Sequence, residues 1–93
     1  MNWHVYILRC ADGTYYVGQT DDLEKRLAQH HAGKGSRYTA ARLPVELVCS
    51  EAFQARAAAM KRETQLKRWS RAKKDALIRG DLAKLRNLSQ SRD

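Results

Sequence analysis

Val5-Tyr6-Ile7-Leu8 and Tyr15-Tyr16-Val17-Gly18, with Asp12-Gly13 between them, are the part of this chain that decides its fold. Both stretches are rich in β-branched and aromatic residues, which favour strands. An Asp-Gly pair between two such stretches is typical of a hairpin turn. The sequence therefore predicts a β-hairpin close to the N-terminus.

The length of the turn decides which side chains share a face. A two-residue loop would place Tyr6 and Tyr16 on opposite faces, because side chains alternate along a strand. A three-residue loop, 11–13, with Gly13 in the left-handed conformation sets Tyr6 opposite Gly18. We predict this second register, in which both tyrosines lie on one face and Gly18 leaves room beside the Tyr6 ring.

Further elements follow from capping residues and apolar patterns. Asp21 and Glu24 predict a helix start, and the helix should end near Ala32. Pro44 predicts a loop over Lys34–Pro44. The remaining predictions are a strand over Val45–Cys49 and helices over Ala52–Trp69, from a cap at Ser70 to Ile78, and over Leu82–Leu88.

The length and charge of the chain bound its function. Ninety-three residues make one small domain, so chemistry should sit on a surface or in a shallow groove. The net charge is +8, and 12 of the 18 basic residues but only five of the ten acidic ones fall in residues 51–93. A basic half predicts nucleic-acid binding; a solvated helical surface and an acidic membrane are the alternatives.

Cysteine content and hydropathy indicate the compartment. Cys10 and Cys49 are too few for a disulfide framework and sit in apolar runs, which predicts buried free thiols. The N-terminus lacks the pattern of a signal peptide, and no apolar run reaches the roughly 20 residues that span a bilayer. We expect a cytoplasmic protein without a membrane segment.

One carboxylate stands out from its surroundings. On a helical wheel, Glu63 falls inside an apolar arc, between Ala59 and Leu66. A carboxylate there needs an ion-pair partner, such as Arg26, or a divalent cation. Arg26 and His30, four residues apart on the first helix, project together toward whatever that helix covers.

These residues carry a resemblance to a known family. Val5-Tyr6 and Tyr16-Val17-Gly18-Gln19-Thr20, with the tyrosines ten positions apart, resemble the paired motif of the GIY-YIG endonuclease superfamily. Arg26 and His30 match its Arg-x-x-x-His/Tyr spacing, and Glu63 matches its metal-binding glutamate. The resemblance covers about residues 3–79 and is strongest to small single-domain bacterial members of uncharacterised role. His4 replaces the first motif's glycine, and Gln19 replaces a lysine that some members carry.

The resemblance implies an α+β fold: a three-stranded antiparallel sheet flanked by helices. It implies a nuclease-like domain over residues 1–80, with residues 81–93 as a short helix and polar tail of the same domain. It also implies hydrolysis of DNA phosphodiester bonds with Mg²⁺ or Mn²⁺. The catalytic set would be Tyr6, Tyr16, Arg26, His30 and Glu63, with Glu63 on the metal; Val5, Val17 and Gly18 would be structural parts of the motif.

Each implied role has a physical basis. Glu63 would hold the cation, and Arg26 would stabilise the charge that gathers on the phosphate. Tyr6 or Tyr16 would orient or deprotonate the attacking water, and His30 would relay the proton. Which tyrosine is the base stays open at this stage.

Nucleic-acid contacts are predicted in a polar loop and along the basic helices. The predicted residues are Lys34, Ser36, Arg37, Tyr38, Lys67, Arg68, Arg71, Lys73 and Lys74, with Lys61 and Arg62 as further phosphate contacts. Trp69 would stack on a base or anchor its helix in the core.

The function expected from these features is endonuclease activity on branched or damaged DNA, as in DNA repair, with RNA as an open alternative substrate. The alternatives are a nucleic-acid-binding module with little or no nuclease activity, and a nuclease subunit that depends on a protein partner or forms a homodimer. The apolar residues Leu82, Leu85 and Leu88 would dock a partner or close the core.

Overall fold

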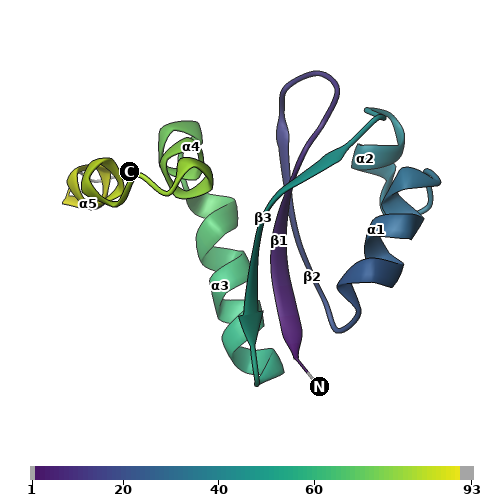
Figure 1. Cartoon of the computed structure of the whole chain (residues 1–93), viewed down its shortest axis with the longest axis horizontal. Helices are drawn as coiled ribbons and strands as arrows, with labels where there is room; N and C mark the ends of the chain where they lie inside the picture. The colour runs from purple at the N-terminus through teal and green to yellow at the C-terminus, as the bar shows by residue number, and fades with distance from the viewer. Residues whose placement is uncertain (1, 91–93) are drawn as a thin grey trace.

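The computed structural model describes residues 2–90 and shows a three-stranded antiparallel sheet with helices on both sides (Figure 1). This confirms the predicted α+β fold class. The strand order is β2-β1-β3. In chain order the elements are β1 (Trp3–Arg9), β2 (Tyr15–Thr20), α1 (Leu23–His31), α2 (Arg37–Ala40), β3 (Glu46–Phe53), α3 (Arg56–Arg68), α4 (Arg71–Arg79) and α5 (Leu82–Gln90).

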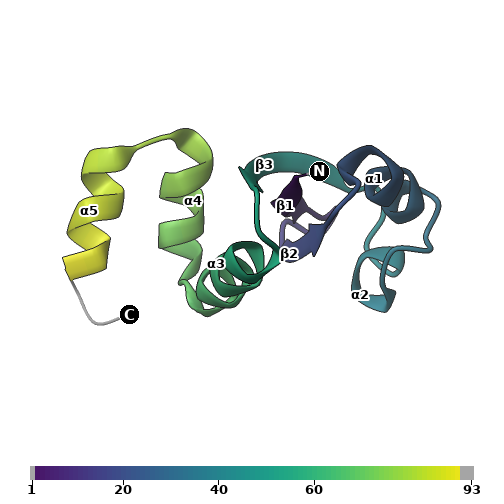
Figure 2. The ribbon, with the colours of Figure 1, turned by 90° about the horizontal axis from the view of Figure 1, so that it is seen from below.

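The elements form layers. Helices α1 and α2 cover one face of the sheet, and α3 covers the other (Figure 1). Helix α5 packs on α4, at the end of the molecule away from α1, as the view from below also shows (Figure 2). The polar tail predicted from the sequence lies, in its last residues 91–93, outside the described residues.

The hairpin has the predicted register. Gly13 adopts a left-handed conformation with φ of 84°, and Cys10 N donates to the Thr14 carbonyl at 2.8 Å. Tyr6 therefore stands opposite Gly18, as predicted from the three-residue loop. A Cβ on Gly18 would lie 2.6 Å from Tyr6 Oη, so the glycine makes room for the phenol.

Alternation divides the apolar residues into two clusters. The cluster between the sheet and α3 consists of Val5, Ile7, Val17, Ala59 and Leu66, each at most 5% exposed. The cluster on the opposite face consists of Tyr6, Leu8, Cys10 and Val45, with half-buried Tyr16, Leu23 and Leu27 packed against it. Burying a large aliphatic side chain contributes about 1.5–3 kcal/mol, so both clusters hold the layers together.

Two local predictions were wrong on the α1 and α2 side. The cap of α1 is Asp22, not Asp21, because the Asp22 carboxylate accepts from Lys25 N at 3.1 Å. The stretch predicted as a loop over Lys34–Pro44 contains the short helix α2, whose cap is Ser36.

The boundary between the third strand and the long helix was also wrong. Residues predicted to begin the helix continue β3 instead, because Ala52 and Phe53 pair with the start of β1. Ala52 and Ala55 are exposed, so neither belongs to the buried side of α3. Cys10 is buried as predicted, whereas Cys49 is half-buried. Across residues 2–90, no helix combines the length and apolarity needed to cross a membrane.

Candidate active site

A buried chain of hydrogen bonds joins β1 to α1 and α2. Tyr6 Oη lies 2.8 Å from His30 Nε2, and His30 Nδ1 lies 2.8 Å from Thr39 Oγ1. Thr39 Oγ1 in turn lies 2.9 Å from Ser36 Oγ, which also accepts from Thr39 N. Tyr6 is 1% exposed, and His30 and Thr39 are fully buried. The chain therefore links a phenol to an imidazole with no solvent between them.

Packing fixes the imidazole in place. Gly35, from the turn between α1 and α2, lies so close to the ring that any Cβ there would collide with His30 Nδ1. The ring also meets Tyr6 and Tyr16 edge-on, at centroid distances of 5.7 and 5.3 Å. His30 can therefore move little without disturbing both tyrosines.

Burial keeps this pair uncharged. Desolvation raises the pKa of Tyr6 well above its ordinary value; Tyr16 and Glu63 raise it further, and only Arg26 lowers it. Desolvation lowers the pKa of His30, and the positive charges of Arg26 and His31 lower it further. At neutral pH, Tyr6 keeps its proton and His30 is a neutral imidazole that can accept one.

Tyr16 is the more accessible of the two tyrosines. Its ring lies 6.5 Å from that of Tyr6, on the same face as predicted, and it stacks on Tyr38 at 6.1 Å. It lines a hollow of about 280 Å³ together with Lys67 and Lys74. The sheet face thus offers one buried phenol and one phenol beside a basic hollow.

Arg26 reaches the same region from α1. Its guanidinium forms no hydrogen bond or ion pair with the residues that the structure describes, yet its charge acts on both Tyr6 and His30. It lines a small hollow of about 120 Å³ at the start of α1. The guanidinium is half-buried and available to an anionic ligand.

Glu63 approaches from α3, on the other side of the sheet, past the edge strand β2. Gln19 Nε2 donates to Glu63 Oε1 at 3.3 Å, and Lys67 Nζ lies 3.4 Å from Glu63 Oε2. The sequence offered Arg26 as an ion-pair partner of Glu63. That alternative was wrong, because Gln19 and Lys67 contact this carboxylate instead. The carboxylate is 19% exposed and raises the pKa of Tyr6, so it belongs to the same electrostatic environment.

The oxygen atoms of Glu63 and Gln19 are suitable partners for a hydrated divalent cation. No cluster of three or more His, Cys, Asp or Glu side chains occurs in residues 2–90, so a cation there would have a single carboxylate ligand. Beside that carboxylate, Gln19 Oε1 is buried and has no hydrogen-bond partner in the described part of the chain. Mg²⁺ prefers oxygen ligands and keeps several waters, and a carboxylate with a neighbouring free acceptor suits that demand.

Several predicted nucleic-acid contacts are accessible. Lys34, Arg37, Lys67 and Arg68 are exposed, and Tyr38 is 36% exposed. Lys74 is half-buried, and burial lowers the pKa of its ammonium, with the Arg71 charge lowering it further. Lys67, Tyr38 and Lys74 line the same hollow as Tyr16.

Other predicted contacts have structural tasks. The prediction for Lys73 was wrong, because it is 5% exposed and its ammonium lies 5.6 Å from the centre of the Trp69 ring. Ser36 uses its hydroxyl to cap α2. Arg71 donates to the Gly13 carbonyl at 2.6 Å, which fastens α4 to the hairpin. The Arg62 guanidinium binds the Glu51 carboxylate through two nitrogens, at 2.7 and 3.0 Å, and so is not a free phosphate contact.

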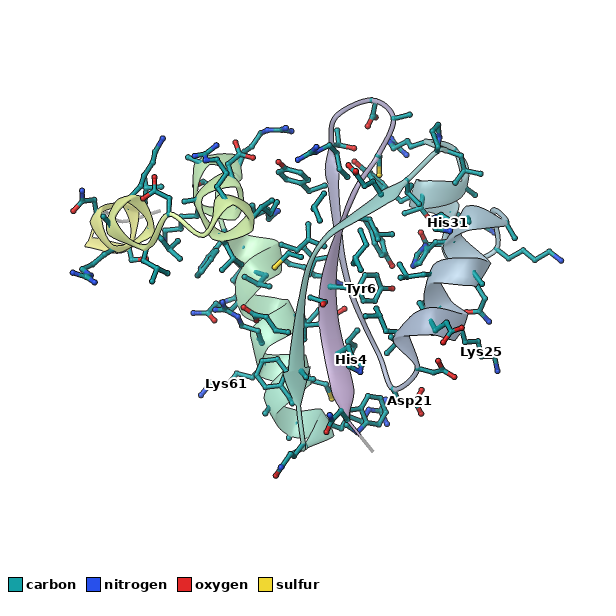
Figure 3. All side chains as sticks on the ribbon, viewed as in Figure 1. His4, Tyr6, Asp21, Lys25, His31 and Lys61 are labelled. Carbon is teal, nitrogen blue, oxygen red and sulfur yellow. The ribbon has the colours of Figure 1, made fainter. Side chains whose placement is uncertain are left out.

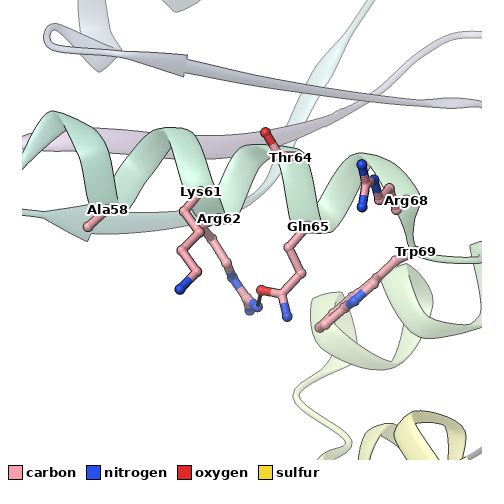
Figure 4. A pocket seen from close by; sticks show the side chains of 7 residues that line it. All are labelled: Ala58, Lys61, Arg62, Thr64, Gln65, Arg68 and Trp69. Carbon is pink, nitrogen blue, oxygen red and sulfur yellow. Dashed lines mark hydrogen bonds between the residues drawn. The ribbon is translucent and has the colours of Figure 1, made fainter.

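The largest hollow described lies on the opposite flank of α3 from Glu63. It measures about 720 Å³ and is lined by Ala58, Lys61, Arg62, Thr64, Gln65, Arg68 and Trp69 (Figure 4). Lys61 points from α3 away from the sheet, whereas Tyr6 lies on the side that α1 covers (Figure 3). Trp69 packs against the α3-side cluster, which supports its interpretation as an anchor.

Two residues of the site were not identified from the sequence. Thr39 continues the chain beyond His30, and Gln19 contacts Glu63. The Ser36-x-x-Thr39 spacing of a capped helix start was a usable signal for Thr39. Gln19 was noted only as the replacement of a lysine, because nothing in the sequence shows which side chain lies opposite it.

The fold is that of a small α+β domain built on a three-stranded antiparallel sheet, with a buried polar cluster on one face. The model of the GIY-YIG catalytic domain matches residues 2–75, and the chain belongs to this family, which is part of a nuclease superfamily. A UPF0213 protein of Halobacterium salinarum is 50% identical over 75 residues, 81% of this chain and 97% of its own. A UPF0213 protein of Bacillus pumilus is 51% identical over 77 residues, 83% of this chain and 79% of its own.

Solved structures of similar proteins agree with the fold. The solution NMR structure of the UPF0213 protein BH0048 from Bacillus halodurans has a TM-score of 0.56 at 45% identity, covering 84% of this chain and 83% of its own. That of the protein EF2693 from E. faecalis has a TM-score of 0.61 at 33% identity, covering 89% and 88%. These similarities confirm the predicted family. They also confirm the predicted resemblance to its small, single-domain members of uncharacterised role.

Proposed function

We propose that this chain is a divalent-cation-dependent endonuclease that hydrolyses phosphodiester bonds in DNA. The observation that carries the proposal is a neutral, buried Tyr6–His30 pair on which two charges act: the guanidinium of Arg26, unpaired among the described residues, and the carboxylate of Glu63. These groups come from β1, α1 and α3, and family membership indicates the kind of reaction. Together they supply a proton path, an anion-binding group and an oxygen ligand.

Arg26 binds the scissile phosphate in this proposal. A guanidinium without a protein partner can donate two hydrogen bonds to phosphate oxygens. Its half-buried position strengthens that interaction, because less water screens it. Charge that develops on the phosphate during attack is then stabilised where it forms.

The two tyrosines have different tasks. Tyr16 is the phenol beside the basic hollow, and we assign it the contact with the attacking water. Tyr6 holds its proton tightly and binds His30, so it is a poor phenolate base by itself. The Tyr6–His30–Thr39 chain instead orients the site and relays a proton: Tyr6 passes its proton to His30 Nε2 as Tyr6 Oη receives one from the attacking water.

Glu63, with Gln19 beside it, would hold Mg²⁺ or Mn²⁺. When bound, the cation polarises the phosphate and stabilises the leaving oxygen. The lysines near Tyr16, above all the exposed Lys67, bind neighbouring phosphates without reading sequence. We propose branched or damaged DNA as the substrate, with a role in DNA repair. A cytoplasmic location stays a prediction from the sequence. The unit of function is proposed to be the domain over residues 1–80 with its C-terminal extension.

The decisive experiment is cleavage of end-labelled DNA by wild type and two variants. Single strands, duplexes, flaps, forks and four-way junctions would be incubated with Mg²⁺, Mn²⁺ or EDTA. We expect Arg26→Ala to slow cleavage by about 100–1,000-fold, and Glu63→Gln to abolish the cation-dependent reaction. Glu46→Gln, which changes an exposed carboxylate on β3, is the matched control and should cleave as wild type does.

Binding without cleavage has a different meaning. If all variants bind DNA in a salt-dependent way and none cleaves it, the nucleic-acid-binding module becomes the better interpretation. Cleavage that appears only with added cell extract would favour the partner-dependent subunit.

A further inference from the structure

Gln19 is the most unusual polar side chain near the candidate site. It lies on the edge strand β2, directly after Gly18, and its Nε2 donates to Glu63 Oε1 at 3.3 Å. Its other amide atom, Oε1, is buried and has no hydrogen-bond partner among the described residues. Buried side-chain acceptors are nearly always paired, so an unpaired one calls for a specific explanation.

Rotating the amide does not solve the problem. If Oε1 and Nε2 exchanged places, the oxygen would face the Glu63 carboxylate and the N–H groups would lose their acceptor. In either orientation one end of the amide is unsatisfied by the described residues. The missing partner of Oε1 is therefore a hydrogen-bond donor from outside residues 2–90.

The charges around Glu63 indicate what kind of donor this is. The second carboxylate oxygen faces the ammonium of Lys67, whose side chain is 57% exposed. Because the lysine end of this pair is exposed, the pair contributes little to stability, and a divalent cation can replace the lysine at the carboxylate. The waters that such a cation retains are strong hydrogen-bond donors.

We propose that Gln19 is a positioning residue for a divalent cation at Glu63. Nε2 holds the Glu63 carboxylate in place, and Oε1 accepts a hydrogen bond from a water of the cation's hydration shell. The inference rests on the proposed cation dependence of the site and adds to it the group that orients the hydrated ion. Outer-shell partners of this kind change metal affinity by roughly 10–100-fold.

The experiment measures binding of Mn²⁺ alone, without DNA, to the full chain. Paramagnetic broadening of backbone amide signals near Glu63 gives the dissociation constant. Gln19→Met preserves the size of the side chain and removes both amide atoms, and we expect about tenfold weaker binding. Gln65→Met, which removes an amide on the opposite flank of α3, is the control and should bind as wild type does.

A second variant separates the oxygen from the nitrogen. Gln19→Glu restores an oxygen acceptor but not the N–H that holds Glu63. If Oε1 serves the hydrated cation, this variant should bind Mn²⁺ at least as tightly as wild type does. Because the added carboxylate also attracts the cation by its charge, weaker binding by Gln19→Glu than by wild type would overturn the role of Oε1.

A diamagnetic titration gives an independent signature. Addition of Mg²⁺ should shift the side-chain amide signals of Gln19 in a saturable way, and Glu63→Gln should abolish that shift. Equal Mn²⁺ affinity in wild type and Gln19→Met would overturn the role of Gln19 while leaving a cation at Glu63. Equal affinity in wild type and Glu63→Gln would contradict both this inference and the cation dependence of the proposed function.

Discussion

The two faces of the sheet are built from alternate residues of the same strands, yet they differ in kind. Toward α3, β1 presents Val5 and Ile7, which belong to a cluster whose fully buried members are all aliphatic. Toward α1, the same strand presents Tyr6, which is equally buried but bonded to His30. One strand therefore serves stability on one side and chemistry on the other.

The comparison shows how a small domain can bury a reactive group. The aliphatic cluster is held by the hydrophobic effect, which has no directional requirement. A change in the size or shape of one side chain there lowers the free energy of unfolding by an amount that depends on the size of the change. The polar face depends on hydrogen bonds, and removing one partner leaves the other buried and unpaired. We therefore expect changes within the aliphatic cluster to alter stability alone, whereas changes in the hydrogen-bonded chain of Tyr6, His30 and Thr39 should alter activity as well.

The largest expected effect lies on the aliphatic face. Ile7→Ala removes a fully buried side chain and should lower the free energy of unfolding by about 2–5 kcal/mol, because it leaves a cavity. Urea unfolding measures this loss. Cleavage per folded molecule should stay at the wild-type level, and Ile7→Val should cost only about 0.5–1.5 kcal/mol. A selective loss of cleavage in Ile7→Ala would break the comparison.

A smaller effect is expected from crowding on the polar face. Gly35→Ala places a Cβ against His30 Nδ1, and overpacking of this kind costs about 1–3 kcal/mol. Cleavage should fall as well, because the ring leaves its position between Tyr6 and Thr39. In a His30→Ala background the same substitution should cost almost nothing. Additive losses in that double-mutant cycle would show that the two positions do not interact.

Removing a single oxygen sharpens the comparison further. Tyr6→Phe keeps the packing of the ring and leaves His30 Nε2 unpaired, which should cost about 1–2 kcal/mol. We expect cleavage to fall about hundredfold, as for loss of a proton-transfer group. Thermal unfolding and single-turnover cleavage measure the two effects on the same preparation. Wild-type cleavage by Tyr6→Phe would restrict the phenol to a structural role.

The smallest effect concerns pH. Burial and the Arg26 charge hold the pKa of His30 below its ordinary value of 6.5, so the unfolded chain binds a proton more readily than the folded one. The free energy of unfolding should therefore fall as the pH drops below about 6.5, until the folded-state pKa is passed. His30→Gln should remove this contribution, which thermal unfolding between pH 7.5 and 5 can detect. An unchanged pH profile in that variant would contradict a buried neutral imidazole.

Local signals allowed much of the molecule to be predicted from its sequence. The register of the hairpin follows from Gly13, because a left-handed glycine fixes a three-residue turn. The shared face of Tyr6 and Tyr16 then follows from alternation alone. Ser70 was also a correct cap, because its hydroxyl accepts from Lys73 N.

The rest depends on contacts between distant parts of the chain. Ala52 was assigned to a helix because an alanine-rich run favours one, but pairing with His4 keeps it in β3. Lys73 was expected at the surface, and only the position of Trp69 shows why it is buried. Likewise, the contact of Gln19 with Glu63 spans 44 positions and leaves no local trace.

Gly18 has a consequence for how such sequences are compared. The Tyr6 phenol fills the space that a side chain at position 18 would need. The two short motifs of the hairpin therefore contact each other at these two residues. Substitutions at the two positions should therefore not be independent during evolution. A residue larger than glycine at position 18 should occur only with a smaller residue at position 6, and with the loss of the buried phenol.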